Sequence, residues 1–358
     1  MIRQHNRING QASRIYCIIG GAVIASILNA EWFDSGSRST PYFRIAVSYH
    51  GKLEFVSRIL STIPPLQIAI YMIDDHLKIE NLVFDGLADQ VTVNKIAKTA
   101  HFQGRDHSVV FLENSLNYSF LNQTASEIAY SIASRHEFET EITSTTNLIG
   151  SYRGGDFTQI IQASHSKISN EWLLLRQLAE LEGYEVFLRK KKLIFAPESL
   201  IEKKYHTIGM DDLIELKISR AMTSAGNVTA AVKTWNSWLN QGYGSYGGEA
   251  DNVDEAPDEL ASARQSDEFT IVTPNLSSSL TNELSRTIQR TMEGGDLTVL
   301  VLMPGETIMN TFDVVTVYDS VTKEASTFTI SSIRRRFSPT SGFLQRIRGV
   351  MTADLVVL

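Results

Sequence analysis

Short runs in which apolar and polar residues alternate follow one another through the first hundred residues of the chain. Leu66–Ile73 and His76–Phe84 alternate on either side of Asp74-Asp75, and Gln90–Asn94 continues the pattern after Gly86. Successive side chains of a β-strand point to opposite faces, so this alternation predicts strands with one buried face. Several short strands joined by turn residues restrict this region to a β-barrel or a β-sandwich.

The N-terminal apolar stretch has two interpretations. Three arginines precede the apolar residues Ile15–Leu28, an arrangement that imitates a secretory signal. Gly20-Gly21 divides the stretch into two runs rich in β-branched residues, and this favours a β-hairpin. Cys17 then lies in a strand as a small core side chain. Because Cys17 is the only cysteine, an internal disulfide framework and a multi-cysteine metal site are excluded, and a reducing compartment is expected.

The hydrophobic period changes in the middle of the chain. Thr124–Glu127 matches a helix capping box, and apolar residues then recur at helical spacing. A second helix is predicted from Ser169 to Gly183, followed by a hairpin with strands at Tyr184–Leu188 and Leu193–Phe195. Residues 108–212 therefore form a predicted mixed α/β domain.

Strands are predicted again after residue 212, with one long interruption. Leu213–Ile218 and Val228–Trp235 have strand character. Residues 241–263 contain four glycines, six acidic residues and no Lys or Arg, which predicts a mobile loop without a core. A third helix is predicted at Ser278–Met292. The last predicted strands are Leu297–Met303, Val314–Tyr318, Ser326–Ile333 and Phe343–Met351.

Length and charge limit the function. The chain has 358 residues, so two or three domains are expected, and 43% hydrophobic residues are enough to form their cores. Its 33 Lys and Arg against 40 Asp and Glu give a net charge of −7, which argues against nucleic-acid binding over the whole surface. No apolar run reaches the roughly 18–20 residues of a membrane helix, so no membrane insertion is expected.

Several short motifs match ligand-binding or catalytic patterns without the context that those patterns require. Gly242–Gly247 spells G-x-G-x-x-G, but an acidic stretch follows where a dinucleotide site needs a helix. Ser164–Lys167 and Ser320–Lys323 match S-x-x-K, which is catalytic only at a helix start within a cleft. Asp74–His76 offers metal ligands but occupies an expected turn. We therefore expect no catalytic residue, no metal site and no cofactor.

Two basic runs remain, Arg189–Lys192 and Arg334–Arg336. The first occupies a predicted hairpin tip. The second ends a predicted strand, so its successive side chains point to opposite faces. Solvation is the favoured interpretation of both runs, and a surface for a charged partner is the alternative.

The order of these segments resembles one known family, the baseplate hub proteins of tailed phages (late control protein D family), also found as the N-terminal half of VgrG spike proteins. The segments that carry the resemblance are Gly104–Ser108 (GRDHS), Phe120–Ile128 (FLNQTASEI), Ser169–Gly183 with the following hairpin, Val232–Asn236 (VKTWN), Pro304-Gly305 and Phe337–Phe343. The motif positions expected to be structurally important are Gly104, Arg105, Asp106, Trp172, Gly183, Trp235, Pro304 and Gly305. We expect Trp172 to anchor its helix in the core of the middle domain and Trp235 to pack a barrel strand.

The resemblance implies an α+β, β-rich fold with two tail-tube-like β-barrel domains. Residues 1–107 would form the first barrel, 108–212 the α/β domain between them, and 213–358 the second barrel with an insertion at about 241–295. Three chains would close into a ring that adapts a six-fold tail tube to a three-fold central spike. The implied role is structural, without catalysis, and places the protein in the virion tail baseplate after assembly in the bacterial host cytoplasm.

The partners implied by the resemblance are two further copies of the chain, the central spike protein, the tail tube or a tube-initiator protein, and also the tape measure protein and the baseplate wedge. DNA would only pass through the channel, and the net negative charge suits such passage because a basic lumen would bind phosphates. Two alternatives are a tail-tip peptidoglycan hydrolase, with paired carboxylates or a metal in a cleft, and a VgrG-like secretion hub. Because no repetitive β-helix precedes Leu358, we expect the spike to be a separate polypeptide.

Overall fold

The computed structural model describes residues 14–37, 39–50, 53–74, 79–116, 119–149, 151–152, 159–161, 170–220, 228–236, 241–246, 249–252, 267–273, 276, 278–293, 297–351 and 356–357. The chain divides into two compact units. The first comprises Met1–Val109, Glu202–Ile218 and Thr298–Leu358, and the second comprises Val110–Ile201 and Ser219–Leu297. The division into three domains, 1–107, 108–212 and 213–358, stays a prediction.

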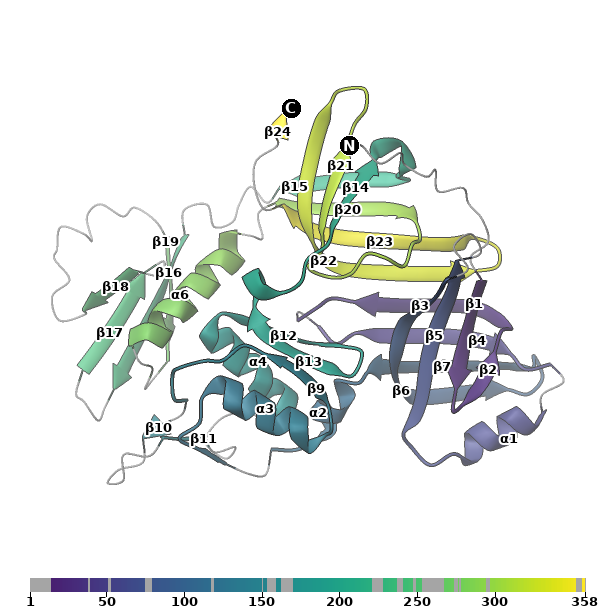
Figure 1. Ribbon diagram of the computed structural model, residues 1–358, viewed down its shortest axis with the longest axis horizontal. Helices are drawn as coiled ribbons and strands as arrows, with labels where there is room; N and C mark the ends of the chain where they lie inside the picture. The colour runs from purple at the N-terminus through teal and green to yellow at the C-terminus, as the bar shows by residue number, and fades with distance from the viewer. Residues whose placement is uncertain are drawn as a thin grey trace. The chain divides into compact units, whose positions relative to one another are not determined.

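The first unit is built on a large, mainly antiparallel sheet (Figure 1), which contains 14 strands among the described residues. Its N-terminal strands are β1 (Arg14–Ile19), β2 (Ala22–Ile24), β3 (Ile27–Asp34), β4 (Tyr42–Ser48), β5 (Leu66–Asp74), β6 (Ile79–Asn94) and β7 (Thr99–Asp106). Its later strands are β14 (Tyr205–Gly209), β15 (Glu215–Arg220), β20 (Leu297–Pro304), β21 (Val314–Tyr318), β22 (Glu324–Ser338), β23 (Gly342–Met351) and β24 (Val356–Val357). The main path runs β15-β20-β23-β22-β3-β4-β7-β6-β5-β1-β2.

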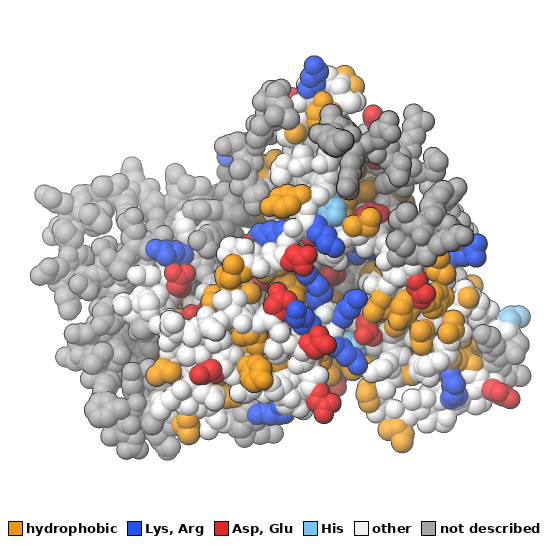
Figure 2. Space-filling view, viewed as in Figure 1, with side chains coloured by type: hydrophobic (Ala, Val, Ile, Leu, Met, Phe, Trp, Pro, Cys, Tyr) orange, Lys and Arg blue, Asp and Glu red, His pale blue; other side chains and the backbone are white. Residues whose placement is uncertain are grey.

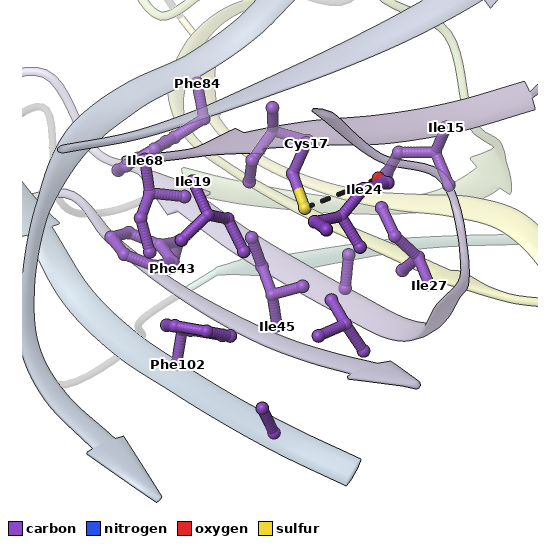
Figure 3. Close-up of a cluster of buried hydrophobic side chains, with 14 of the residues drawn as sticks. Ile15, Cys17, Ile19, Ile24, Ile27, Phe43, Ile45, Ile68, Phe84 and Phe102 are labelled. Carbon is purple, nitrogen blue, oxygen red and sulfur yellow. Dashed lines mark hydrogen bonds between the residues drawn. The ribbon is translucent and has the colours of Figure 1, made fainter. Parts of the chain in front are cut away.

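The predicted N-terminal hairpin is confirmed. β1 and β2 pair antiparallel around Gly20-Gly21, with Cys17 opposite Ile24. Alternate residues of β1 are buried, and Cys17 lies among isoleucines and phenylalanines of the neighbouring strands, where its thiol donates to the carbonyl of Ile24 (Figure 3). Burial raises the pKa of Cys17 to about 12, so this thiol serves as a core side chain and not as a nucleophile.

A short helix in the N-terminal region, α1 (Leu53–Ser61), lies where the sequence indicates only strands. Phe55, Val56 and Ile59 are buried in the same core as the strands. Their spacing of one and four residues is helical. Helix α1 has only nine residues, and alternating β-type runs lie on either side of it, so its helical period is hard to recognise in the sequence.

The second unit holds three smaller sheets and most of the helices. The first group of elements is α2 (Val109–Glu113), β8 (Phe120–Leu121), α3 (Ala125–Arg135), β9 (Glu139–Ile142), β10 (Ser151–Tyr152), β11 (Gln159–Ile161), α4 (Glu171–Glu182), β12 (Tyr184–Arg189) and β13 (Lys192–Pro197), followed by the short 3-10 turns η1 (Glu198–Leu200) and η2 (Met210–Asp212). The second group is β16 (Val228–Asn236), β17 (Gln241–Tyr246), β18 (Glu249–Asn252), β19 (Asp267–Val272) and α6 (Ser278–Glu293). The sheets are β10-β11-β8, β12-β13-β9 and β18-β17-β16-β19.

Local signals placed α3, α4 and α6 correctly, whereas the short helix α2 was not predicted. The capping box at the start of α3 is complete, with the Thr124 hydroxyl accepting from the Glu127 amide and the Glu127 carboxylate accepting from the Thr124 amide. α4 ends at Gly183, which adopts a left-handed conformation with φ 67°. Helix α6 packs on β16, where Ser285 donates to the Ala230 carbonyl and the Gln289 side chain accepts from the Ala230 amide.

The mobile loop predicted at 241–263 is wrong for its first part. β17 and β18 form a hairpin there, and β17 also pairs with β16. Main-chain ladder bonds to β16 stabilise these strands in spite of a composition that could not form a core on its own. Residues 253–263 lie outside the described residues. In the part of the chain that the structure describes, no helix is long and apolar enough to cross a membrane.

Candidate functional site

The N-terminal and C-terminal strands of the first unit meet where β22 pairs with β3. Arg335 lies opposite Trp32, and Arg336 lies opposite Glu31. β22 also pairs with β23 on its other edge. Segments about three hundred residues apart in the chain thus form one continuous sheet. A cluster of charged side chains, the junction cluster, lies here and comprises Arg335, Glu306, Asp34, Asp313 and Asp106.

Arg335 is the centre of this junction cluster. Its side chain is 6% exposed. The guanidinium Nε donates to the carbonyl of Glu306 at 3.1 Å and to Gln345 Oε1 at 3.3 Å, and Nη2 donates to the carbonyl of Met309. Burial lowers the pKa of Arg335, while the carboxylates of Glu306, Asp34 and Asp313 raise it. An arginine stays charged in such surroundings, so the hydrogen bonds and carboxylates compensate a permanent buried charge.

The connection from β20 to β21 folds over this guanidinium. The Glu306 carboxylate accepts from the amide of Met309 at 2.9 Å, which closes the connection on itself. Asn81 Nδ2 donates to Thr307 Oγ1 at 3.0 Å and so ties the connection to β6. The connection therefore has a fixed shape, and Ile308 within it is 58% exposed.

Asp313 fixes the C-terminal end of the β20–β21 connection through hydrogen bonds. Its carboxylate accepts from His206 Nε2 at 2.9 Å, from the Lys204 amide at 3.0 Å and from the Asn310 amide at 2.9 Å. Burial alone raises the pKa of Asp313, but the hydrogen bonds from His206, Lys204 and Asn310 together keep that pKa below its usual value. Asp313 is therefore a structural carboxylate.

Asp106 is the second buried carboxylate of the junction. It is 7% exposed, and its Oδ1 accepts from the Ser108 amide and hydroxyl. Burial raises the pKa of Asp106 to about 7, the Ser108 hydrogen bonds oppose this increase, and the nearby charge of Asp34 adds to it. The neighbouring His107 is 3% exposed and pairs with Asp85 at 3.0 Å.

The predicted motif positions of the first unit lie on its strands. Gly104 permits a close approach of backbone, because a Cβ there would lie 2.0 Å from the Leu87 carbonyl oxygen. Arg105 forms a two-point pair with Asp89, with both N···O distances at 2.8 Å. Pro304 and Gly305 end β20, and the Gly305 amide donates to the Phe343 carbonyl at 2.8 Å. Only Asp106 belongs to the junction cluster.

The other predicted motif positions belong to the second unit. Trp172 is 5% exposed and stacks on Phe111 with ring centroids 6.2 Å apart. Gly183 ends α4, and a Cβ there would lie 2.8 Å from Thr287 Oγ1. The backbone of Trp235 in β16 pairs with Gly242 in β17, but the Trp235 side chain lies outside the described residues. These positions do not gather into a site.

The junction cluster could not be predicted from the sequence. The sequence interpretation assigned Arg334–Arg336 to solvent, which is wrong for Arg335, although Arg334 and Arg336 are exposed as the alternation predicts. The available signal was the alternation itself, since one arginine of a strand triplet must face the side opposite to its neighbours. The buried carboxylates that compensate it come from distant segments and carry no local mark.

The short motifs that match ligand-binding or catalytic patterns lie away from the junction cluster or outside the described residues. Among the described residues, no group of three or more His, Cys, Asp and Glu side chains is placed to hold a metal ion. The G-x-G-x-x-G segment begins in strand β17, not in a turn before a helix. Ser320–Lys323 forms the exposed turn between β21 and β22, where Asp319 accepts from Val321 and Thr322. Ser164–Lys167 and His76 lie outside the described residues.

Comparison of the whole structure with solved structures identifies its fold. The MuSo2 prophage 43 kDa tail protein from Shewanella oneidensis superimposes with a TM-score of 0.66 at 14% identity, over 95% of this chain and 98% of that chain. The tail protein from Neisseria meningitidis MC58 gives 0.67 at 10% identity, over 96% and 97%. The chain has the fold of phage tail proteins.

The fold also matches a complex that contains VgrG. A structure of the Francisella PdpA-VgrG complex matches with a TM-score of 0.58 at 10% identity, over 97% of this chain and 59% of that chain. No protein-family model and no curated protein matches the sequence. The expected resemblance to hub-type tail proteins and VgrG is confirmed at the level of fold, and the β-rich fold class with it.

Proposed function

We propose that this chain is a structural hub of a phage tail baseplate. The observation that carries the proposal is the agreement in fold with tail proteins along almost the full length of both chains. In this proposal three copies close into a ring that joins a six-fold tail tube to a three-fold central spike. The role is mechanical and needs no catalytic residue.

The sheet of the first unit supports ring formation. Its path begins at β15 and ends at β2, so each of these strands has one edge that no described strand covers. Exposed strand edges favour aggregation unless they are paired or covered. Closure with neighbouring copies removes such edges, and the two sets of strands would then supply the two tube-like barrels of each chain, with residues 108–212 between them.

The surface charge supports passage of DNA without binding. Figure 2 shows acidic and basic side chains interspersed on the face that it presents. A basic lumen would bind phosphates, whereas mixed or acidic walls would not. The proposed partners are the spike protein, the tail tube or a tube initiator, the tape measure protein and the baseplate wedge, within the virion after assembly in the host cytoplasm.

The mass of the purified full chain in solution tests the proposal. We expect a trimer, or a monomer that becomes trimeric when the spike protein is added, as measured by light scattering after gel filtration. A stable monomer that never trimerises with the spike and that cleaves purified cell wall would contradict the proposal and favour the hydrolase alternative.

A secretion-system hub is the second candidate, and the match to the PdpA-VgrG complex favours it. The two functions differ in where the protein is found. A phage hub is recovered in tail particles after induction of the phage, whereas a secretion hub is recovered in culture supernatant without particles. Mass spectrometry of both fractions distinguishes them.

A further inference from the structure

A groove of about 710 Å³ runs along helix α3 of the second unit. Its walls are the segment that leads from β8 into α3, the solvent side of α3, and strand β9 with the residues that follow it. The groove shares no residue with the junction cluster, and the proposed hub function assigns it no role. Three features indicate what it binds.

The first feature is a free strand edge. β9 pairs only with β13, in parallel, and ends the sheet β12-β13-β9. The Glu139 amide donates to the carbonyl of Lys191, just before β13, at 3.1 Å, and the Thr143 amide donates to the carbonyl of Phe195 in β13 at 2.9 Å. Alternate residues of a strand direct their main-chain groups to the same side, so the N–H and C=O groups of Thr140 and Ile142 point away from β13. Both residues line the groove, and no described residue pairs with their main chain on that side.

The second feature is an excess of acceptors. Glu127 lines the groove, and one of its carboxylate oxygens already accepts from the Thr124 amide. Gln123 also lines the groove, and its buried Oε1 has no hydrogen-bond partner among the described residues. No Lys, Arg or His is among the described residues that line the groove. Glu127 is the one charged residue among the described lining, so charge complementarity favours an occupant that carries positive charge.

The third feature is apolar area beside the polar groups. Leu121 is 55% exposed and Tyr130 is 58% exposed, and both line the groove with the partly buried Ile142. Side chains that alternate along an extended segment would place one set on this apolar area and the other toward solvent and Glu127.

We propose that this groove binds an extended polypeptide segment that carries lysine or arginine and adds as a strand to the free edge of β9. Strand addition uses main-chain hydrogen bonds for affinity and alternate side chains for specificity. Thr140 and Ile142 supply the main-chain groups, Leu121 and Tyr130 the apolar contact, and Glu127 the negative charge. A glycan could also use the hydroxyl groups of such a groove, and the experiment below separates the two.

The test uses peptide display on the immobilised full-length chain. Random peptides of about ten residues are long enough for one strand of about five to six residues. Thr140→Pro removes the N–H that faces the groove and leaves the ladder to β13 intact, because that N–H does not bond to β13. Thr140→Val is the matched control, since it keeps the N–H and the strand propensity.

We expect selected peptides to be rich in Lys or Arg at alternate positions. Thr140→Pro should weaken their binding roughly three- to tenfold, as for one lost hydrogen bond, while Thr140→Val leaves it unchanged. Glu127→Gln keeps the capping box and should weaken binding about two- to fivefold. If Thr140→Pro does not fold, hydrogen exchange of the wild-type chain is measured with and without bound peptide. The proposal then predicts that the peptide protects the amides of Thr140 and Ile142 from exchange.

Three results would overturn the proposal. The first is that the selected peptides lack basic residues. The second is that Thr140→Pro does not weaken peptide binding and the bound peptide does not protect the amides of β9. The third is that a chitin oligosaccharide binds and that Thr140→Pro leaves its binding unchanged. None of these results depends on trimer formation, so this experiment can fail while the hub proposal still holds, and the reverse is also true.

Discussion

At the scale of single residues, Arg335 shows how a permanent charge can be stable inside this protein. A buried ion is costly unless hydrogen bonds and opposite charges satisfy it. Two main-chain carbonyls and Gln345 accept from its guanidinium, and the carboxylates of Glu306, Asp34 and Asp313 lie near. Arg335 thereby connects the paired strands β3 and β22 to the β20–β21 connection, and its removal would leave buried carboxylates without compensation.

Arg335→Met should destabilise the protein by about 3–5 kcal/mol, the usual cost of leaving one partner of a buried ionic group uncompensated. Arg336→Ala is the matched control on the same strand. The Arg336 side chain is 71% exposed and its nitrogen lies 3.9 Å from Glu31, so its loss should cost under about 1 kcal/mol. Urea unfolding measures both, and equal effects would contradict the role assigned to Arg335.

Asp106 predicts a pH dependence of stability. Its pKa is about 7 in the folded chain, because burial raises it, and about 4 in an unfolded chain. The folded state therefore binds more protons between these values, and stability falls as the pH rises through that window. The contribution is fully present below about pH 4 and is lost above about pH 7.

Asp106→Asn removes this dependence while it keeps an acceptor for Ser108. We expect the difference in unfolding free energy between wild type and variant to shift against the wild type as the pH rises from about 5 to about 8. Urea midpoints at a series of pH values measure this difference. A difference that stays constant with pH would show that Asp106 ionises normally.

At the scale of elements, the close pairing of β6 and β7 depends on Gly104. A Cβ at this position would meet the Leu87 carbonyl oxygen at 2.0 Å and the Phe43 ring at 2.8 Å, and backbone atoms cannot move aside without breaking the ladder. The motif glycine is therefore explained by strand packing and needs no ligand.

Gly104→Ala should cost about 1–3 kcal/mol or more, as forced overpacking does. Gly209→Ala provides the comparison, because its Cβ would lie 3.4 Å from a carboxylate oxygen of Asp212, a distance close to ordinary contact. Thermal melting of both variants tests the expectation, and it fails if the two variants melt together.

At the scale of the whole molecule, the first unit joins the beginning and the end of the chain through β3 and β22. Strands paired in one sheet with a shared core should open together. The second unit has its own core around α3, α4 and α6. A substitution that destabilises the C-terminal strands should therefore destabilise the N-terminal strands as well, before it affects the second unit.

Hydrogen exchange of Arg335→Met tests this coupling. Protection should fall in β3 and β4 as well as in β22 and β23, whereas the amides of α3 should keep their wild-type protection. If only the C-terminal strands lose protection, the N-terminal strands form an independent domain, as the three-domain interpretation of the sequence requires.

Local patterns in the sequence determined the local structure of this protein. The period of two, the Gly-Gly turn, the Thr124–Glu127 capping box and Gly183 act over a few residues, where propensity and hydrogen bonding decide the conformation. The same patterns indicated helix α6 and most C-terminal strands. They missed α1 and α2, and they assigned β17 and β18 to a loop because the glycine-rich, acidic composition of this segment gave no sign that β17 pairs with its sequence neighbours β16 and β18.

Only the tertiary structure decided which strands share a sheet and which charges are buried. β22 pairs with β3 although about three hundred residues separate them, and no local pattern specifies that pairing. Arg335 differs from Arg334 and Arg336 solely in the side of the strand that it faces, and its partners Glu306, Asp34 and Asp313 come from separate segments. Burial and compensation of charge are properties of the assembled core, and the sequence near each residue carries no record of them.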